Sequence, residues 1–123
     1  MSEIRANTVS DAAGTGPVTL TKQSAAKAWA TVNMSGTAAI SDSFNFTSLT
    51  DNGTGDYTAT FTSAMANGNY AANASNDRSG TVGASQSNAY QRNVADVRCI
   101  NANSAGSVAD FTKNSVTAHG DLA

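Results

Sequence analysis

Alternation of aromatic and polar residues is the feature of this sequence that most restricts its fold. Residues 43–47 alternate phenylalanines with polar residues, and residues 57–62 repeat that period of two. Such a period is typical of a β-strand with one buried face. The polar run between the two segments contains the pair Asn52-Gly53, which supplies the positive φ angles that a tight reversal needs. The pattern therefore predicts a β-hairpin.

Further strands are expected along the chain. Residues 29–34 alternate in the same way, after a helical turn over residues 25–28 that Ser24 would cap. The remaining expected strands lie around Tyr70 and over residues 81–84, 94–100, 107–112 and 115–122, with polar loops at 73–80 and 101–106. Short strands at close, regular spacing predict an all-β fold for residues 24–123, either an antiparallel β-sandwich or a jelly roll.

Residues 1–23 lack this period. Their apolar residues, Ile4, Val9, Val18 and Leu20, are spaced too irregularly to form one face of a helix. We interpret the segment as an extended N-terminal attachment arm, which adds strands or hydrogen bonds along a neighbouring subunit. A disordered polar tail is the alternative.

Composition excludes several classes of partner. Charged residues make up 13% of the chain, the net charge is −2, and the seven basic residues are dispersed. No basic stripe is present to neutralise successive phosphates, so nucleic acid is not an expected partner. No apolar run approaches the ~20 residues that span a bilayer, and the first residues lack the layout of a secretory signal. We therefore expect no membrane partner and synthesis in the cytoplasm.

The supply of large apolar side chains is small for a self-sufficient domain. Leu, Ile, Val and Phe together make up about 15% of the residues, and a single cysteine excludes an intrachain disulfide. Part of the apolar surface is therefore expected to be buried against other subunits. The side chains assigned to this subunit interface are the aromatic residues of the alternating segments: Trp29, Phe44, Phe46, Tyr57 and Phe61.

Candidate catalytic and metal-binding residues are few. His119 is the only histidine, no sequence context singles out a nucleophile beside it, and Cys99 lies in an alternating apolar segment typical of a buried side chain. Residues 51–56 carry oxygen ligands suited to Ca²⁺, but a turn whose Asp and Asn side chains bond their own backbone explains the same residues. We expect no catalytic residue, no cofactor and no metal ion, and so a protein that is not an enzyme.

Three aromatic residues outside the hairpin, Tyr70, Tyr90 and Trp29, allow a second interpretation. Exposed aromatic rings stack on sugars, whereas one aromatic residue per strand is also ordinary in a core or an interface. We favour the core or interface interpretation for these three residues.

Several stretches of the chain resemble a family of bacteriophage virion proteins, especially short fibres and the fibre domains of marine and cyanobacterial phages. These stretches are residues 20–29, residues 42–58 with the run Asp51-Asn52-Gly53-Thr54-Gly55-Asp56-Tyr57, residues 61–70 and the closing residues 120–123. The resemblance implies a β-sandwich that forms trimers on the exterior of the particle, either in a tail fibre or as a fibre or decoration protein on the head. The family has no catalytic residues to carry over.

The function expected from these observations is structural. The chain is interpreted as a short trimeric fibre or decoration (cement) protein of a virion that assembles in the host cytoplasm, with itself and major capsid or tail proteins as partners. The alternative is a receptor- or carbohydrate-binding module of a tail fibre, in which the loops at 73–80 and 101–106 contact a host-surface glycan. A depolymerase is a third hypothesis, but it requires paired carboxylates that the sequence does not single out.

Overall fold

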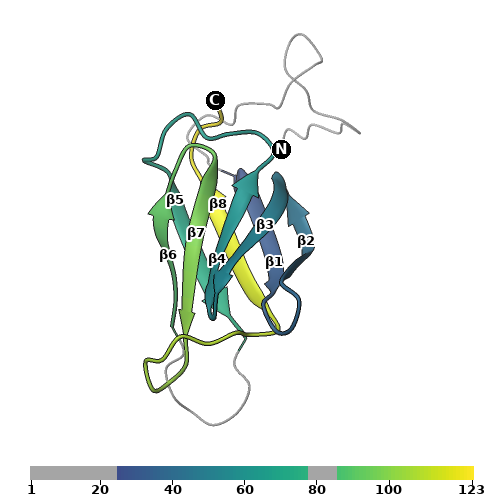
Figure 1. The fold of residues 1–123 in the computed structure, drawn as a ribbon. Helices are drawn as coiled ribbons and strands as arrows, with labels where there is room; N and C mark the ends of the chain where they lie inside the picture. The colour runs from purple at the N-terminus through teal and green to yellow at the C-terminus, as the bar shows by residue number, and fades with distance from the viewer. Residues whose placement is uncertain (1–24, 78–85) are drawn as a thin grey trace, which may run out of the picture.

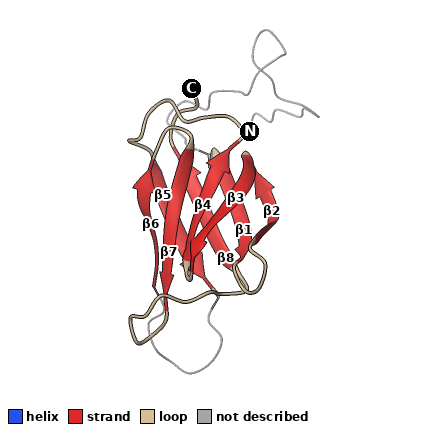
Figure 2. Ribbon diagram, viewed as in Figure 1, coloured by secondary structure: helices blue, strands red, loops and turns tan. Residues whose placement is uncertain are grey.

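The computed structural model describes residues 25–77 and 86–123, and these residues form eight β-strands without a helix (Figures 1 and 2). The strands are β1 (Ala28–Asn33), β2 (Ala39–Phe44), β3 (Phe46–Gly53), β4 (Asp56–Phe61), β5 (Ala71–Asn76), β6 (Gln86–Arg92), β7 (Asp96–Ala102) and β8 (Asn114–His119). The expected arm, residues 1–23, and its residues Ile4, Val9, Val18 and Leu20 lie outside the described residues.

The strands form two four-stranded sheets that pack face to face. Sheet A has the order β2-β1-β8-β5 and sheet B the order β3-β4-β7-β6, and every pairing is antiparallel. In Figure 1, sheet B lies toward the viewer and sheet A behind it. The predicted all-β sandwich is confirmed.

The predicted hairpin is confirmed as β3 and β4, with its reversal placed slightly later than expected. Gly53 pairs with Asp56, so the chain reverses through Thr54 and Gly55. The positive φ angles belong to Gly53 (125°) and Gly55 (70°), and Asn52 does not adopt one. The two glycines, and not the Asn-Gly pair, therefore supply the left-handed conformations.

The alternating segment at residues 43–47 is not one strand. β2 ends at Phe44 in sheet A, β3 begins at Phe46 in sheet B, and Asn45 between them has a φ of 58°. This left-handed residue carries the chain from one sheet to the other, so Phe44 is exposed while Phe46 is buried. The alternation in the sequence runs through this break because only one residue, Asn45, separates the two phenylalanines.

Several other sequence predictions are wrong or need adjustment. Residues 25–27 are not helical, residues 107–112 contain an isolated bridge and no strand, and residues 81–84 are outside the described residues. β5 occupies part of the loop predicted at 73–80, and β6 was not predicted. Both strands consist mainly of Asn, Ser, Ala and Gln, which are not among the residues enriched in strands, and they are held by pairing to β8 and β7. β7 and β8 lie close to the predicted segments 94–100 and 115–122.

The core lies between the sheets and uses alternate residues of the central strands. Its buried side chains are Ala28, Ala30, Val32, Met34, Phe46, Tyr57, Ala59, Phe61, Met65, Tyr70, Val97, Cys99, Val116 and Ala118. Phe61 stacks on Phe46 with ring centroids 4.9 Å apart and meets Tyr70 edge to face at 5.7 Å. The hydroxyl of Tyr70 donates to the carbonyl oxygens of Asn93 and Asp96.

Raising the pH is expected to lower the free energy of unfolding. Burial raises the pKa of Tyr70 and of the Cys99 thiol to about 12, and it raises the pKa of Tyr57 as well. In an unfolded chain tyrosine titrates near pH 10 and cysteine near 8.5, so the unfolded state releases protons that the folded state keeps. The stability from these neutral groups is complete below about pH 8.5 and is lost as the pH rises toward 12. Each buried tyrosine removes about 1.4 kcal/mol per pH unit above pH 10.

Urea denaturation at pH 8, 9, 10 and 11 measures this loss. The variant Tyr70→Phe has one titrating group fewer, so its stability should fall less steeply above pH 10 than that of the parent protein. Equal slopes for the two proteins would contradict the assignment of Tyr70.

Candidate functional site

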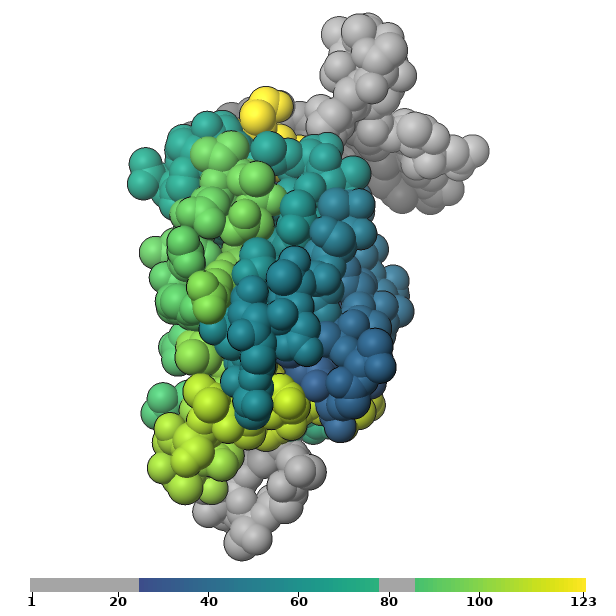
Figure 3. Space-filling view, viewed as in Figure 1, coloured from purple at the N-terminus to yellow at the C-terminus, as the bar shows by residue number. Residues whose placement is uncertain are grey.

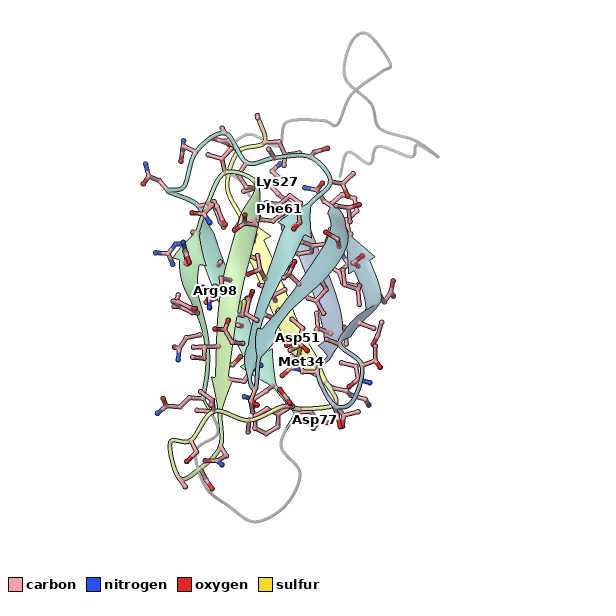
Figure 4. The ribbon with its side chains drawn as sticks, viewed as in Figure 1. Lys27, Met34, Asp51, Phe61, Asp77 and Arg98 are labelled. Carbon is pink, nitrogen blue, oxygen red and sulfur yellow. The ribbon has the colours of Figure 1, made fainter. Side chains whose placement is uncertain are left out.

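Four polar and aromatic side chains meet on the outer face of sheet B. Each strand of the sheet contributes one of them: Asn52 from β3, Asp56 from β4, Arg98 from β7 and Tyr90 from β6. Sheet B faces the viewer in Figures 3 and 4, and Figure 4 labels Arg98 on it. We call these four residues the Asp56 cluster.

An ion pair forms the centre of the Asp56 cluster. Arg98 donates through Nε to Oδ1 of Asp56 at 2.9 Å and through Nη2 to Oδ2 at 2.6 Å. The residues are close because Arg98 pairs with Thr58 across β4 and β7, which places its side chain beside that of Asp56 two residues earlier. This two-bond geometry fixes the plane of the guanidinium relative to the carboxylate.

Two β-bulges bring the outer members of the cluster to the ion pair. In β3, Asp51 pairs with Tyr57 and Gly53 with Asp56, which leaves Asn52 as the extra residue. In β6, Ala89 pairs with Cys99 and Gln91 with Arg98, which leaves Tyr90 as the extra residue. Bulges redirect side chains and are frequent next to functional sites.

Both extra residues contact the carboxylate. Asn52 Nδ2 donates to Asp56 Oδ1 at 3.3 Å and to Thr58 Oγ1 at 2.9 Å. The hydroxyl of Tyr90 lies 3.4 Å from Asp56 Oδ2, and the guanidinium carbon of Arg98 lies 5.5 Å from the centre of the Tyr90 ring. The Asp56 carboxylate therefore has a polar neighbour from each of the other three strands.

The cluster keeps its two charges over a wide pH range. The hydrogen bonds from Arg98 lower the pKa of Asp56, and the same bonds raise the pKa of Arg98. Partial desolvation, followed by the nearby Asp56 charge, raises the pKa of Tyr90. At neutral pH the cluster is thus a neutral combination of one carboxylate, one guanidinium and one phenol.

A second surface lies on the outer face of sheet A. Trp29 of β1 and Phe44 of β2 are directly paired across the strands and are 38% and 55% exposed. We call this pair the aromatic patch. Trp29 lies two residues after Lys27, which Figure 4 labels at one end of the sandwich.

The structure corrects most of the predicted interface. Phe46, Tyr57 and Phe61 are buried within the core of one chain, so they offer no surface to another subunit. They point inward because they occupy the core-facing positions of β3 and β4. Trp29 and Phe44 remain on the surface, and for them the interface stays a prediction.

Other predicted site residues fall in different places. Tyr70 is buried, so it does not stack on a sugar, whereas Tyr90 is 48% exposed. Cys99 is a small buried side chain, as predicted, and His119 is half-buried at the end of β8.

The segment at 51–56 behaves as a turn. Asp51 Oδ1 accepts a hydrogen bond from the Gly53 N–H at 2.9 Å, and Asp56 is bound by Arg98. Over residues 25–77 and 86–123, no group of three or more His, Cys, Asp or Glu side chains is placed to hold a metal ion. In the same part of the chain, no helix has the length and hydropathy of a membrane span.

The Asp56 cluster was not predicted because a β-bulge cannot be recognised from the alternation of apolar and polar residues. Its one available signal was a charged residue, Arg98, at an outward position of a central strand, where an exposed carboxylate on the neighbouring strand would be its natural partner. Comparison with known proteins adds no relative: no family model, no curated protein and no solved structure matches the chain.

Proposed function

We propose that this chain is a non-enzymatic structural component of a bacteriophage virion, a short trimeric fibre or decoration (cement) protein on the surface of the particle. The observation that carries the proposal is the aromatic patch, Trp29 and Phe44, on the outside of a complete β-sandwich. The resemblance of residues 42–58 to phage fibre proteins supports the same function.

The aromatic patch is suited to contact with another copy of the chain. Aromatic residues are enriched in interfaces between subunits, and here two of them are adjacent across paired strands. β2 is also an edge strand of sheet A, so one side of its backbone has no partner strand among residues 25–77 and 86–123. A second copy that covers β2 would bury both the rings and this edge.

Under this proposal the two ends of the sandwich have different roles. The backbone N–H of Lys27 donates to the carbonyl of Ala118, and Met65 bridges Leu122, so residue 27 and the last residues lie at the same end (Figure 1). In this proposal that end faces the particle, and residues 1–23, which precede it in the sequence, bind a major capsid or tail protein. The opposite end, with the turns at residues 54–55 and 103–107, projects from the particle.

Removing the aromatic patch is expected to dissociate the trimer. Phe44→Ser exposes no core residue but removes a ring worth about 1.5–3 kcal/mol when buried, so the dissociation constant should rise at least tenfold. Sedimentation equilibrium of the full chain at 1–50 µM measures the change. Val108→Ser is the matched control, because Val108 is 48% exposed at the other end of the sandwich and should leave the trimer intact.

A folded monomer of the parent protein at 50 µM would contradict the proposal, as would an unchanged trimer in Phe44→Ser. Immunogold labelling of intact particles with an antibody to this chain tests the virion location directly.

A further inference from the structure

We propose that Asn67 is a modification site, at which the folded chain undergoes spontaneous deamidation, whereas the fold protects Asn52 from the same reaction. The chain contains two Asn-Gly pairs, Asn52-Gly53 and Asn67-Gly68. Glycine has no side chain to hinder attack by its own backbone nitrogen on the preceding amide, so the dipeptide alone marks both pairs equally. The surroundings of the two pairs differ, and they separate the two sites. The proposal does not depend on the oligomeric state of the protein or on its location.

The reaction consumes only water and releases ammonia. The backbone nitrogen of Gly68 gives up its proton to hydroxide and attacks Cγ of Asn67, which closes a five-membered succinimide ring. The bond from Cγ to Nδ2 breaks, and Nδ2 takes up a proton and leaves as ammonia. Water then adds to one of the two ring carbonyls and opens the ring to aspartate or isoaspartate. The modified residue carries a carboxylate in place of an amide.

The first argument is that both reacting nitrogens at Asn67 are unrestrained. Asn67 is an exposed residue of the connection between β4 and β5 and belongs to no strand. Among residues 25–77 and 86–123, neither the N–H of Gly68 nor Nδ2 of Asn67 donates a hydrogen bond. Ring closure therefore breaks no hydrogen bond of the attacking or of the leaving nitrogen within this part of the chain.

The second argument is the state of the amide carbonyl under attack. Oδ1 of Asn67 accepts a hydrogen bond from the N–H of Asn69 at 2.8 Å. This bond keeps the side-chain carbonyl turned toward the residues that follow it, on the side from which Gly68 attacks. The same N–H stabilises the negative charge that develops on Oδ1 as the new bond forms. The one hydrogen bond that the Asn67 side chain makes in the described part of the chain thus favours the reaction.

The third argument is the opposite situation at Asn52. Its Nδ2 donates to Oδ1 of Asp56 at 3.3 Å and to Oγ1 of Thr58 at 2.9 Å, and the N–H of Gly53 donates to Oδ1 of Asp51 at 2.9 Å. Ring closure must break all three bonds. Loss of the Gly53 proton would also place a negative charge beside the Asp51 carboxylate. We therefore expect deamidation at Asn52 to be at least tenfold slower than at Asn67.

A packing constraint explains why glycine occupies position 68. A Cβ at Gly68 would lie 3.1 Å from the carbonyl oxygen of Arg92, so the connection between β4 and β5 approaches the end of β6 more closely than a larger residue allows. The adjacent Ala66 N–H donates to the carbonyl of Asp121 at 2.8 Å. Deamidation therefore adds one negative charge to a chain of net charge −2 at the end of the sandwich that holds the last residues.

Peptide mapping by mass spectrometry tests the proposal. The full chain is incubated at pH 8 and at pH 9, and the fractions of aspartate and isoaspartate at both positions are followed over time. We expect conversion at Asn67 at least tenfold faster than at Asn52, and faster at pH 9, because the attacking nitrogen must lose a proton. In concentrated urea, where the surroundings of the two pairs are lost, the two rates should become similar.

The variant Thr58→Val tests the protection of Asn52. Valine keeps the shape of the side chain but removes the acceptor for Nδ2, so the rate at Asn52 should rise at least threefold while the rate at Asn67 stays unchanged. Circular dichroism checks that the variant is folded, and Asn67 serves as the internal control. Equal rates at the two positions in the folded protein, a difference that persists in urea, or an unchanged rate at Asn52 in Thr58→Val would overturn the proposal.

Discussion

Substitution of Gly55 by alanine is expected to reduce the free energy of unfolding by about 3–5 kcal/mol, because it combines backbone strain with a steric clash. Gly55 has a φ of 70°, and a Cβ at this position would lie 2.6 Å from the carbonyl oxygen of Asn101 and 2.7 Å from the backbone nitrogen of Ala109. Both neighbours are backbone atoms, so no side-chain rotation relieves the contact.

The neighbouring backbone is also held by hydrogen bonds that a shift would break. Gly55 N–H donates to Asp110 Oδ1 at 2.7 Å, and the N–H of Asn101 donates to the Gly55 carbonyl at 2.7 Å. These bonds attach the reversal between β3 and β4 to β7 through Asn101 and to the loop that follows β7 through Asp110. Moving either partner to make room for a methyl group would cost about 1 kcal/mol for each bond lost.

Gly36→Ala is the matched control for this experiment. Gly36 has a φ of 80°, close to that of Gly55, but a Cβ there would meet nothing within 4 Å. It should therefore show the conformational cost alone, about 1 kcal/mol. Urea denaturation of both variants measures the difference, and equal losses would show that the close approach at Gly55 is unimportant.

Substitution of Asn45 by alanine is expected to cost about 3 kcal/mol, since this residue supports the crossing between the two sheets in two ways. It adopts a φ of 58°, which asparagine tolerates better than alanine. Its Nδ2 donates to the carbonyls of Lys27 (3.1 Å) and Ser63 (3.0 Å), and its Oδ1 accepts from the Ser63 N–H (2.7 Å). Alanine removes all three bonds.

Two further substitutions separate these contributions. Asn45→Gly loses the same bonds but accepts the positive φ, so it should be about 1 kcal/mol more stable than Asn45→Ala. Asn45→Asp keeps the acceptor for Ser63 but directs an oxygen at two carbonyls, and it should be less stable than Asn45→Gly above pH 5. Thermal denaturation monitored by circular dichroism ranks the variants, and a stability of Asn45→Ala within 1 kcal/mol of the parent would contradict this account.

The sequence predicts those elements in which large apolar residues alternate with polar ones. β1 and β4 follow from Trp29–Met34 and Tyr57–Thr62 because Val32, Tyr57 and Phe61 are large enough to mark the buried face. In β5 the residues packed against the core are Ala72 and Ala74, which are only partly buried, and alanines among asparagines do not distinguish a strand from a loop. A strand whose core-facing residues are small is therefore not predicted by the alternation of apolar and polar residues.

The surfaces were less predictable than the strands, for a different reason. Whether an aromatic residue of an alternating segment points inward depends on where the chain changes sheet, and Asn45 makes that change between Phe44 and Phe46. The Asp56 cluster depends on strand order, because β4 and β7 are neighbours although Asp56 and Arg98 are far apart in sequence. Neither the change of sheet nor the strand order can be predicted from the residues of one short segment.

The placement of residue 27 and the last residues at one end of the sandwich has a practical consequence for protein engineering. A reporter fused after Ala123 would share that end with whatever precedes β1, and so would compete for the same space. The turn after β7 is at the opposite end, and Asn103 holds it closed through bonds from the N–H groups of Ala105 and Ser107. A peptide epitope inserted between residues 104 and 106 would thus be displayed away from the termini.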